Sequence, residues 1–148
     1  MANYYATSRT NYFRVTDEER YKELFKNLVG LESEICDFTF TKEENGITLH
    51  GFGSYGPISY RVPNSNTDED YDDEDYDFDQ FLAELQAILP ENEAFIYMEA
   101  GNEKLRYITG FSVVVTKNDI ASVDIRSAAL EIAKRLLNDK KFDTQMEY

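Results

Sequence analysis

The 148-residue chain has one cysteine, one histidine, three prolines and no tryptophan. A single cysteine, Cys36, excludes an intrachain disulfide and a thiolate zinc cluster. A single histidine, His50, excludes any site that needs two imidazoles. No apolar run approaches the roughly 20 residues that cross a bilayer, and no basic segment followed by an apolar one opens the chain. We therefore expect a cytoplasmic protein without a secretory signal or a membrane anchor.

Basic residues are also scarce, with 15 lysines and arginines against 29 acids and a net charge of −14. Binding to nucleic-acid phosphates or to anionic membranes needs clustered basic side chains, so neither is expected. The apolar share of 42% and the aromatic share of 14% are those of a folded chain rather than of a disordered acidic tail. Since the length also suits one domain, we predict a single folded domain over residues 1–148.

The negative charge is confined to one part of the sequence. No lysine or arginine lies between Arg61 and Lys104, and residues 62–103 hold 14 of the 29 acids. The remaining 15 acids are balanced by the 15 bases, so this window carries the whole net charge. Nine of its acids fall in an acidic segment, residues 63–79, at Asp68, Glu69, Asp70, Asp72, Asp73, Glu74, Asp75, Asp77 and Asp79. An ordinary solvated surface mixes both signs, so this polarisation indicates a specific role.

Hydrophobic periodicity predicts one helix among several strands in the N-terminal half. The helix begins at a capping box of Thr16 with Glu19, carries apolar residues at helical spacing and ends at Gly30. Asn45-Gly46 favours the positive backbone angles of a hairpin turn. The predicted strands cover residues 12–15, 36–41, 47–52 and 58–62.

The C-terminal half predicts two more helices and three more strands. One helix follows the acidic segment, starting at a capping box of Asp77 with Gln80 and closing before Pro90. Two of the strands are joined by a turn at Gly101-Asn102. The strands cover residues 95–99, 105–116 and 120–125, the last helix begins near residue 127, and residues 142–148 form a short tail. Adjacent hairpins with helices between them predict an α+β fold, a mostly antiparallel sheet of about five to six strands with three helices.

The acidic segment has three interpretations: a solvating loop, a loose calcium loop, or a surface that imitates the phosphates of DNA. Asp68, Asp70 and Asp72 match the first three ligand positions of an EF-hand loop, and Asp79 falls at the twelfth. Asp73 stands where such a loop needs glycine for its sharp turn. A true EF-hand is therefore not expected, which leaves weak calcium binding as an option.

Phosphate mimicry needs carboxylates at a spacing comparable to that of phosphates. Alternate residues of an extended chain lie about 6.6 Å apart and helical neighbours about 5–6 Å, while DNA phosphates rise by about 3.4 Å along each strand. Carboxylates of residues 68–103 would then enter a groove built for phosphates, with the interleaved Tyr71 and Tyr76 as contact anchors. The predicted partner-binding residues are Asp68, Glu69, Asp70, Tyr71, Asp72, Asp73, Glu74, Asp75, Tyr76, Asp77 and Asp79.

Other motifs give no support for catalysis or for a cofactor. Residues 51–56 match a GxGxxG string, but a strand is predicted to follow where dinucleotide binding needs a helix. His50 and Cys36 lie on strand patterns, where a buried structural cysteine is favoured over a thiolate pair. Glu99 and Arg106 lie near one turn, where surface ion pairs are expected instead of catalytic carboxylates. We therefore predict no enzyme activity, no cofactor and no metal.

Two segments, residues 9–15 (RTNYFRV) and 103–110 (EKLRYITG), resemble segments of small uncharacterised proteins from bacterial plasmids, phages and transposons. The acidic polarity is similar to that of the DNA-mimicking antirestriction and anti-CRISPR proteins that such elements carry. The resemblance implies a non-enzymatic inhibitor that acts in the bacterial cytoplasm by blocking the DNA-binding site of a CRISPR or restriction nuclease. The alternatives are an acidic module that binds a basic host or conjugation protein without competing with DNA, and a weak calcium-binding protein. Exposed strand edges in a tyrosine-rich sheet also permit a homodimer.

Overall fold

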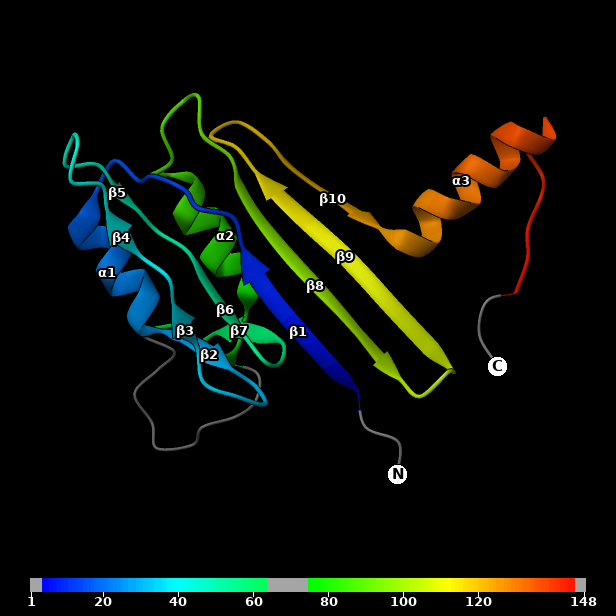
Figure 1. Ribbon diagram of the computed structural model, residues 1–148, viewed down its shortest axis with the longest axis horizontal. Coiled ribbons are helices and arrows are strands. Elements are labelled where there is room, and N and C mark those ends of the chain that lie inside the picture. The colour runs from blue at the N-terminus through cyan, green and yellow to red at the C-terminus, as the bar shows by residue number, and fades with distance from the viewer. Residues whose placement is uncertain (1–3, 64–74, 146–148) are drawn as a thin grey trace.

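A computed structural model describes residues 4–63 and 75–145. Its main sheet is built from β1 (Tyr5–Thr10), β3 (Cys36–Asp37), β6 (Phe52–Ser54), β8 (Phe95–Glu103), β9 (Tyr107–Val115) and β10 (Ile120–Asp124). All neighbouring strands of this sheet are antiparallel, in the order β10-β9-β8-β1-β6-β3 (Figure 1). The predicted α+β fold with a mostly antiparallel sheet is confirmed.

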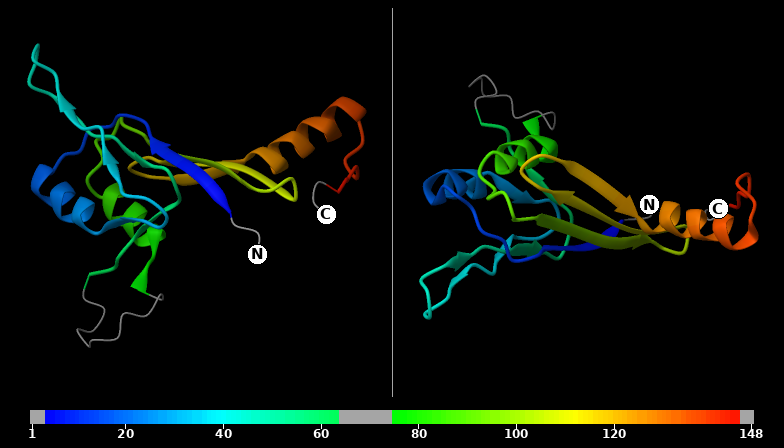
Figure 2. Two further views of the ribbon diagram at one scale, coloured as in Figure 1. Left: turned by 60° about the horizontal axis from the view of Figure 1, so that its bottom comes forward. Right: turned by 90° about the horizontal axis from the view of Figure 1, so that it is seen from above.

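Two separate two-stranded sheets accompany the main sheet. β2 (Leu28–Gly30) pairs with β7 (Ile58–Tyr60), and β4 (Phe40–Thr41) pairs with β5 (Thr48–Leu49). The turn between β4 and β5 follows the predicted Asn45-Gly46 signal, with Gly46 at a φ of 70° and the Ile47 amide donating to Asn45 Oδ1 at 3.0 Å. Figure 2 shows this hairpin projecting to the side of the sheet opposite the helices of the core.

Three helices lie within the described residues, and they have different surroundings. α1 (Glu18–Lys26) and α2 (Phe78–Gln86) cover one face of the sheet and contribute side chains to the core (Figures 1 and 2). α3 (Ile125–Leu137) follows β10 directly and stands away from that core beside the sheet edge. None of its side chains is buried.

The core is dominated by aromatic rings that meet between the two packed helices and the sheet. Phe95 on β8 lies at its centre, with ring centroids 5.0 Å from Phe13 and 6.1 Å from both Phe52 and Phe81. All four rings are fully buried. Edge-to-face and tilted contacts of this kind add to the gain from removing the rings from water. The hydrophobic centre therefore lies beneath α1 and α2, far from α3.

The strand predicted at residues 12–15 is wrong, because the strand ends earlier. β1 stops at Thr10, and at Asn11 the backbone amide still donates to the Ile96 carbonyl at 3.0 Å, while the side chain accepts from the Ile96 amide and donates to the Ala94 carbonyl. Phe13 leaves the sheet and makes only an isolated bridge to His50. A side-chain amide thus completes the pairing at this end of the strand, which an aromatic and β-branched pattern does not reveal.

The ends of the first helix also differ from the prediction. Asp17 is the N-cap, accepting from the Arg20 amide at 3.0 Å, while the Thr16 hydroxyl donates to the Ile88 carbonyl beyond α2. Gly30 does not end the helix but lies in β2. A Cβ there would stand 1.7 Å from the Ser33 carbonyl oxygen, so glycine is needed for a close backbone approach.

The predicted turn at Gly101-Asn102 is wrong as well. Both residues lie inside β8, and the chain turns at Lys104, whose φ is 51°. A Cβ on Gly101 would stand 2.3 Å from the Tyr5 carbonyl oxygen, so this glycine allows β1 to approach β8. The glycine signal was therefore a packing requirement within the sheet.

Candidate acidic binding surface

The two flanks of the acidic segment meet on the body of the protein. The Val62 amide donates to the Asp75 carbonyl at 2.8 Å, and the Asp77 amide donates to the Tyr60 carbonyl at 2.8 Å. Between these two bonds, residue 61 pairs with residue 76 in an antiparallel bridge. These two short segments, residues 60–62 and 75–77, form a paired base from which the acidic segment leaves the body of the protein. Because Tyr60 ends β7 and is almost fully buried, this paired base is fixed to the core.

Four of the predicted partner-binding residues are described by the structure: Asp75, Tyr76, Asp77 and Asp79. Tyr76 is 42% exposed on the paired base, and Asp77 and Asp79 are exposed. The other predicted residues lie outside the described residues: Asp68, Glu69, Asp70, Tyr71, Asp72, Asp73 and Glu74. The described members are therefore neighbours on one surface at the start of α2.

The first turn of α2 holds its acids in place. Asp77 is the N-cap, as predicted, and its side chain accepts from the Asp79 amide at 3.0 Å. The other half of the predicted capping box is wrong, because Gln80 donates to Glu84 within the helix instead of reaching back. Phe78 packs on Phe81 and on Tyr97 of β8, with the latter centroid 4.9 Å away. Carboxylates at this helix end also meet the positive end of its dipole.

Three other acids of residues 62–103 are used inside the fold. Glu84 pairs with Arg20 of α1, and Glu93 accepts from the Arg14 side chain at 3.0 Å. Glu99 accepts from the buried Tyr97 hydroxyl at 2.7 Å. These carboxylates stabilise contacts within the molecule, so they are poor candidates for binding a partner.

The acids of residues 62–103 do not form one continuous strip. Glu103 lies at the turn between β8 and β9, which Figures 1 and 2 place at the far end of the sheet from α2. The structure also keeps Glu99 and Arg106 apart, since four residues of strand from 99 to 103 already span about 13 Å. Arg106 instead lies over the ring of Tyr107. The candidate surface is therefore narrower than residues 68–103 and is centred on the acidic segment.

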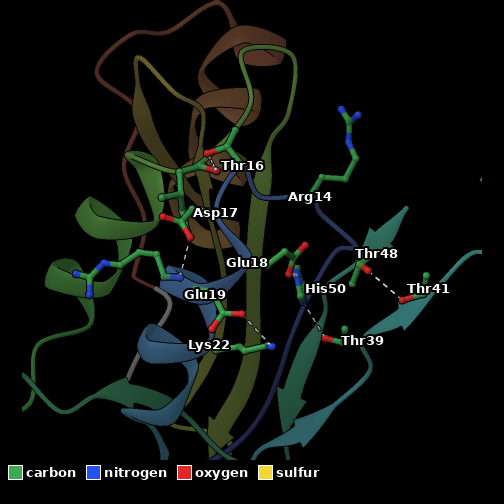
Figure 3. A network of polar contacts seen from close by, with 12 residues as sticks. Arg14, Thr16, Asp17, Glu18, Glu19, Lys22, Thr39, Thr41, Thr48 and His50 are labelled. Carbon is green, nitrogen blue, oxygen red and sulfur yellow. Dashed lines mark hydrogen bonds and ion pairs between the residues drawn. The ribbon is translucent and has the colours of Figure 1, made fainter. Parts of the chain in front are cut away.

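His50 belongs to a polar network that joins α1 to the neighbouring strands (Figure 3). Its Nε2 donates to Glu18 Oε2 at 2.7 Å, and its Nδ1 lies 3.2 Å from the Thr39 hydroxyl. Its ring is buried and packs against the Tyr21 ring in a tilted arrangement, with centroids 4.0 Å apart. Both ring nitrogens thus face partners that hold the fold together. No spacing in the sequence links residues 18, 39 and 50, so the network could not be predicted.

Cys36 is exposed, which contradicts the prediction of a buried structural cysteine. It lies on β3, the edge strand of the main sheet. Phe38, which follows it at the spacing of one strand face, is exposed as well, so this face of the strand is not buried. The GxGxxG string of residues 51–56 runs through β6 rather than into a helix. A Cβ on Gly53 would stand 2.7 Å from the Ser8 carbonyl oxygen, so this glycine also serves strand packing.

Tyr21 supplies a stability prediction, because its buried hydroxyl has no hydrogen-bond partner among the described residues. Burial, with the nearby charges of Asp37 and Glu18, raises the pKa of its phenol far above the ordinary value. Tyr21→Phe removes an unsatisfied polar group, so we expect it to raise the free energy of unfolding by about 0.5–2 kcal/mol at pH 7. Urea unfolding measures this, with Tyr55→Phe as an exposed control.

The same variant should alter the alkaline limb of the stability profile. Above about pH 10 the Tyr21 phenol ionises in the unfolded chain but stays protonated in the folded protein. The contribution of this raised pKa to the free energy of unfolding is therefore complete below about pH 10 and is lost as the pH rises above that value. Tyr21→Phe should therefore flatten the loss of stability above pH 10. A Phe variant less stable than the parent at pH 7 would mean that the hydroxyl has a stabilising partner.

The described residues hold no group of three or more histidine, cysteine, aspartate or glutamate side chains placed to bind a metal ion. Within residues 4–63 and 75–145, no helix is long and apolar enough to cross a membrane. The chain matches no protein-family model, no curated protein and no solved structure. Function is therefore inferred from the charge and geometry of this chain itself.

Proposed function

We propose that this protein is a non-enzymatic inhibitor that binds the DNA-binding site of a bacterial defence nuclease, of the CRISPR or restriction kind, through its acidic segment. The carboxylates take the places of DNA phosphates on the basic surface of the nuclease. Tyr76, exposed beside them, is a contact anchor. The protein works by occupying the site, without a cofactor and in the cytoplasm.

The observation that carries the proposal is the separation of charge along the chain. All of the net charge lies in residues 62–103, and nine of its acids lie within twelve residues of the acidic segment. Close carboxylates repel one another, so they destabilise the free protein and are relieved when a basic surface arrives. Long-range attraction of this kind also speeds the encounter with a basic partner.

The fold supports the proposal by the way it presents the flanks of the acidic segment. The paired base fixes residues 62 and 75 side by side, and α2 begins at Phe78 with Asp77, two residues after Asp75, as its cap. Phe78 locks this helix start onto β8. Acids presented from a fixed platform lose less conformational entropy on binding than acids on a free tail.

The test is affinity capture from bacterial lysate on the immobilised full chain, with and without excess duplex DNA. We expect a nuclease to be retained in the absence of DNA and released when DNA is added. The identified nuclease is then purified, and a gel-shift assay measures whether the chain displaces its DNA substrate. Raised salt should weaken both competitors, because each binds through the same basic side chains.

Three other outcomes contradict the proposal. A partner retained equally with and without DNA, or a ternary complex of chain, partner and DNA, identifies an acidic interaction module of another kind. A rise of several degrees in melting temperature with calcium chloride, reversed by a chelator, identifies a calcium-binding protein. A competition experiment that leaves the nuclease fully bound to DNA also rejects phosphate mimicry.

A further inference from the structure

α3 is an amphipathic helix, and none of its side chains is buried by the part of the chain that the structure describes. Its apolar residues Ile125, Ala129, Ile132 and Leu136 follow a 4-3-4 spacing, which is typical of helices that pack along a seam. Ile132 is 48% exposed and Leu136 is 76% exposed. A 13-residue helix is only marginally stable alone in water, so such a stripe normally packs against something.

An apolar groove of about 540 Å³ lies beside the first turn of α3, on the face of β8 and β9 that carries Met98 and Ala100. Side chains alternate between the two faces of a strand, so this face is opposite the one on which Tyr97 packs into the core. Small residues, Ala100, Gly110 and Ser112, face one another across β8 and β9 and form part of its lining. Met98 and Val123, both more than 40% exposed, contribute larger apolar side chains. Small residues on a sheet surface let another backbone approach closely, so the groove suits an apolar helix.

α3 cannot fill the groove of its own chain. Asp124 is both the last residue of β10 and the N-cap of α3, so no linker allows the helix to fold back. Ile125 and Ala128, in the first turn, border the groove, and the rest of the helix leads away from it (Figures 1 and 2). Within residues 4–63 and 75–145, the apolar stripe beyond the first turn is therefore left uncovered, which makes a second molecule the candidate partner.

The charges of the chain favour a second copy as that molecule. Residues 125–141 carry five basic and two acidic side chains, a net charge of +3. Residues 1–124 without the acidic segment carry ten basic and 16 acidic side chains, a net charge of −6. The helix of one copy is thus attracted to the body of another, and a twofold axis satisfies both attractions at once.

We infer that this protein forms a twofold symmetric homodimer in which α3 of each copy packs its apolar stripe against the groove of the other. The arrangement places the two helices side by side, because each groove is bordered by the first turn of its own α3. It covers the large exposed side chains Ile132 and Leu136 together with Val123. The inference is independent of the proposed function, since it uses no residue of the acidic segment and α2 lies away from α3 (Figure 1).

The test measures the mass of the full chain by light scattering after size exclusion and by sedimentation equilibrium. We expect about twice the 17.2 kDa of one copy for the parent protein. The double variant Ile132→Asp with Leu136→Asp should be monomeric, because it places charges in the apolar stripe. The matched control, Leu31→Asp with Ile47→Asp, alters two exposed apolar residues elsewhere and should remain dimeric.

A second variant addresses the groove without changing the helix. Ala100→Trp fills the groove from the exposed face of β8 and should also give a monomer, while Asn102→Trp, two residues further along the same face, should leave the dimer intact. Circular dichroism and thermal melting confirm that each variant is folded. A parent protein that is monomeric at about 100 µM overturns the inference, including a monomer whose α3 binds a different protein. Dimeric Ile132 and Leu136 variants overturn it too.

Discussion

Neutralising four adjacent acids of the acidic segment is expected to weaken binding to the target nuclease by roughly 30- to 900-fold. The estimate takes about 0.5–1 kcal/mol for each charge pair that is lost. The variant carries Asp72→Asn, Asp73→Asn, Glu74→Gln and Asp75→Asn, which keep the size of the side chains. The backbone carbonyl of Asp75, which accepts from Val62, is unchanged, so the paired base should persist. Titration calorimetry against the purified nuclease measures the loss.

A matched variant separates local charge from total charge. Glu32→Gln, Glu34→Gln, Glu43→Gln and Glu44→Gln remove the same number of charges from exposed positions outside residues 62–103. We expect this control to bind within about threefold of the parent protein, because remote exposed charges act mainly on the rate of encounter. Equal losses in both variants would attribute binding to overall charge. Full binding by the first variant would reject the acidic segment as the binding site.

Phe95→Ala is expected to lower the free energy of unfolding by about 3–5 kcal/mol. The ring lies within about 6 Å of three other buried aromatic rings, so its removal leaves a cavity bounded by α2, by β6 and by the segment between β1 and α1. Neighbours that belong to three different parts of the chain cannot all move inward to fill it. Such a loss is a large part of the stability of a typical domain, so partial unfolding at 37 °C is expected.

Chemical denaturation at a single protein concentration measures this effect, since the proposed dimer would make the midpoint depend on concentration. Tyr55→Ala removes an aromatic ring that is 77% exposed and should change the unfolding free energy by less than about 0.5 kcal/mol. A loss below 1 kcal/mol for the Phe95 variant would mean that the four-ring cluster is not the centre of the core.

The elements that the sequence predicted best are those whose signal is local. The apolar periodicities of all three helices and the Asn45-Gly46 turn depend on neighbouring residues, and each matches the structure. The errors come from tertiary contacts. The Thr16 hydroxyl donates to the Ile88 carbonyl instead of capping the first helix. Gly101 allows β1 to lie close to β8 instead of forming a turn. Periodicity predicts which segments form helices or strands. It does not predict which distant segment a given side chain contacts in the folded protein.

The candidate site was only partly predictable for the same reason. The concentration of acids is visible in the sequence, but whether an acid is exposed or paired within the fold depends on residues far along the chain. Glu93, for example, pairs with Arg14. The groove on the outer sheet face had no signal, because Ala100, Gly110 and Ser112 become neighbours only through strand register. The concentration of negative charge can thus be predicted from the sequence. Which acids lie on an open surface can be determined only from the fold.

Because of the paired base at residues 60–62 and 75–77, the stability of the rest of the protein depends little on the length of the acidic segment. Its backbone bonds close the chain at one place, and the entropic cost of a longer connection grows only by about 0.6 kcal/mol for each doubling in length. Residues can therefore be gained, lost or exchanged between positions 63 and 75 with little effect on folding. Selection can revise the segment against a changing target while the rest of the protein stays the same.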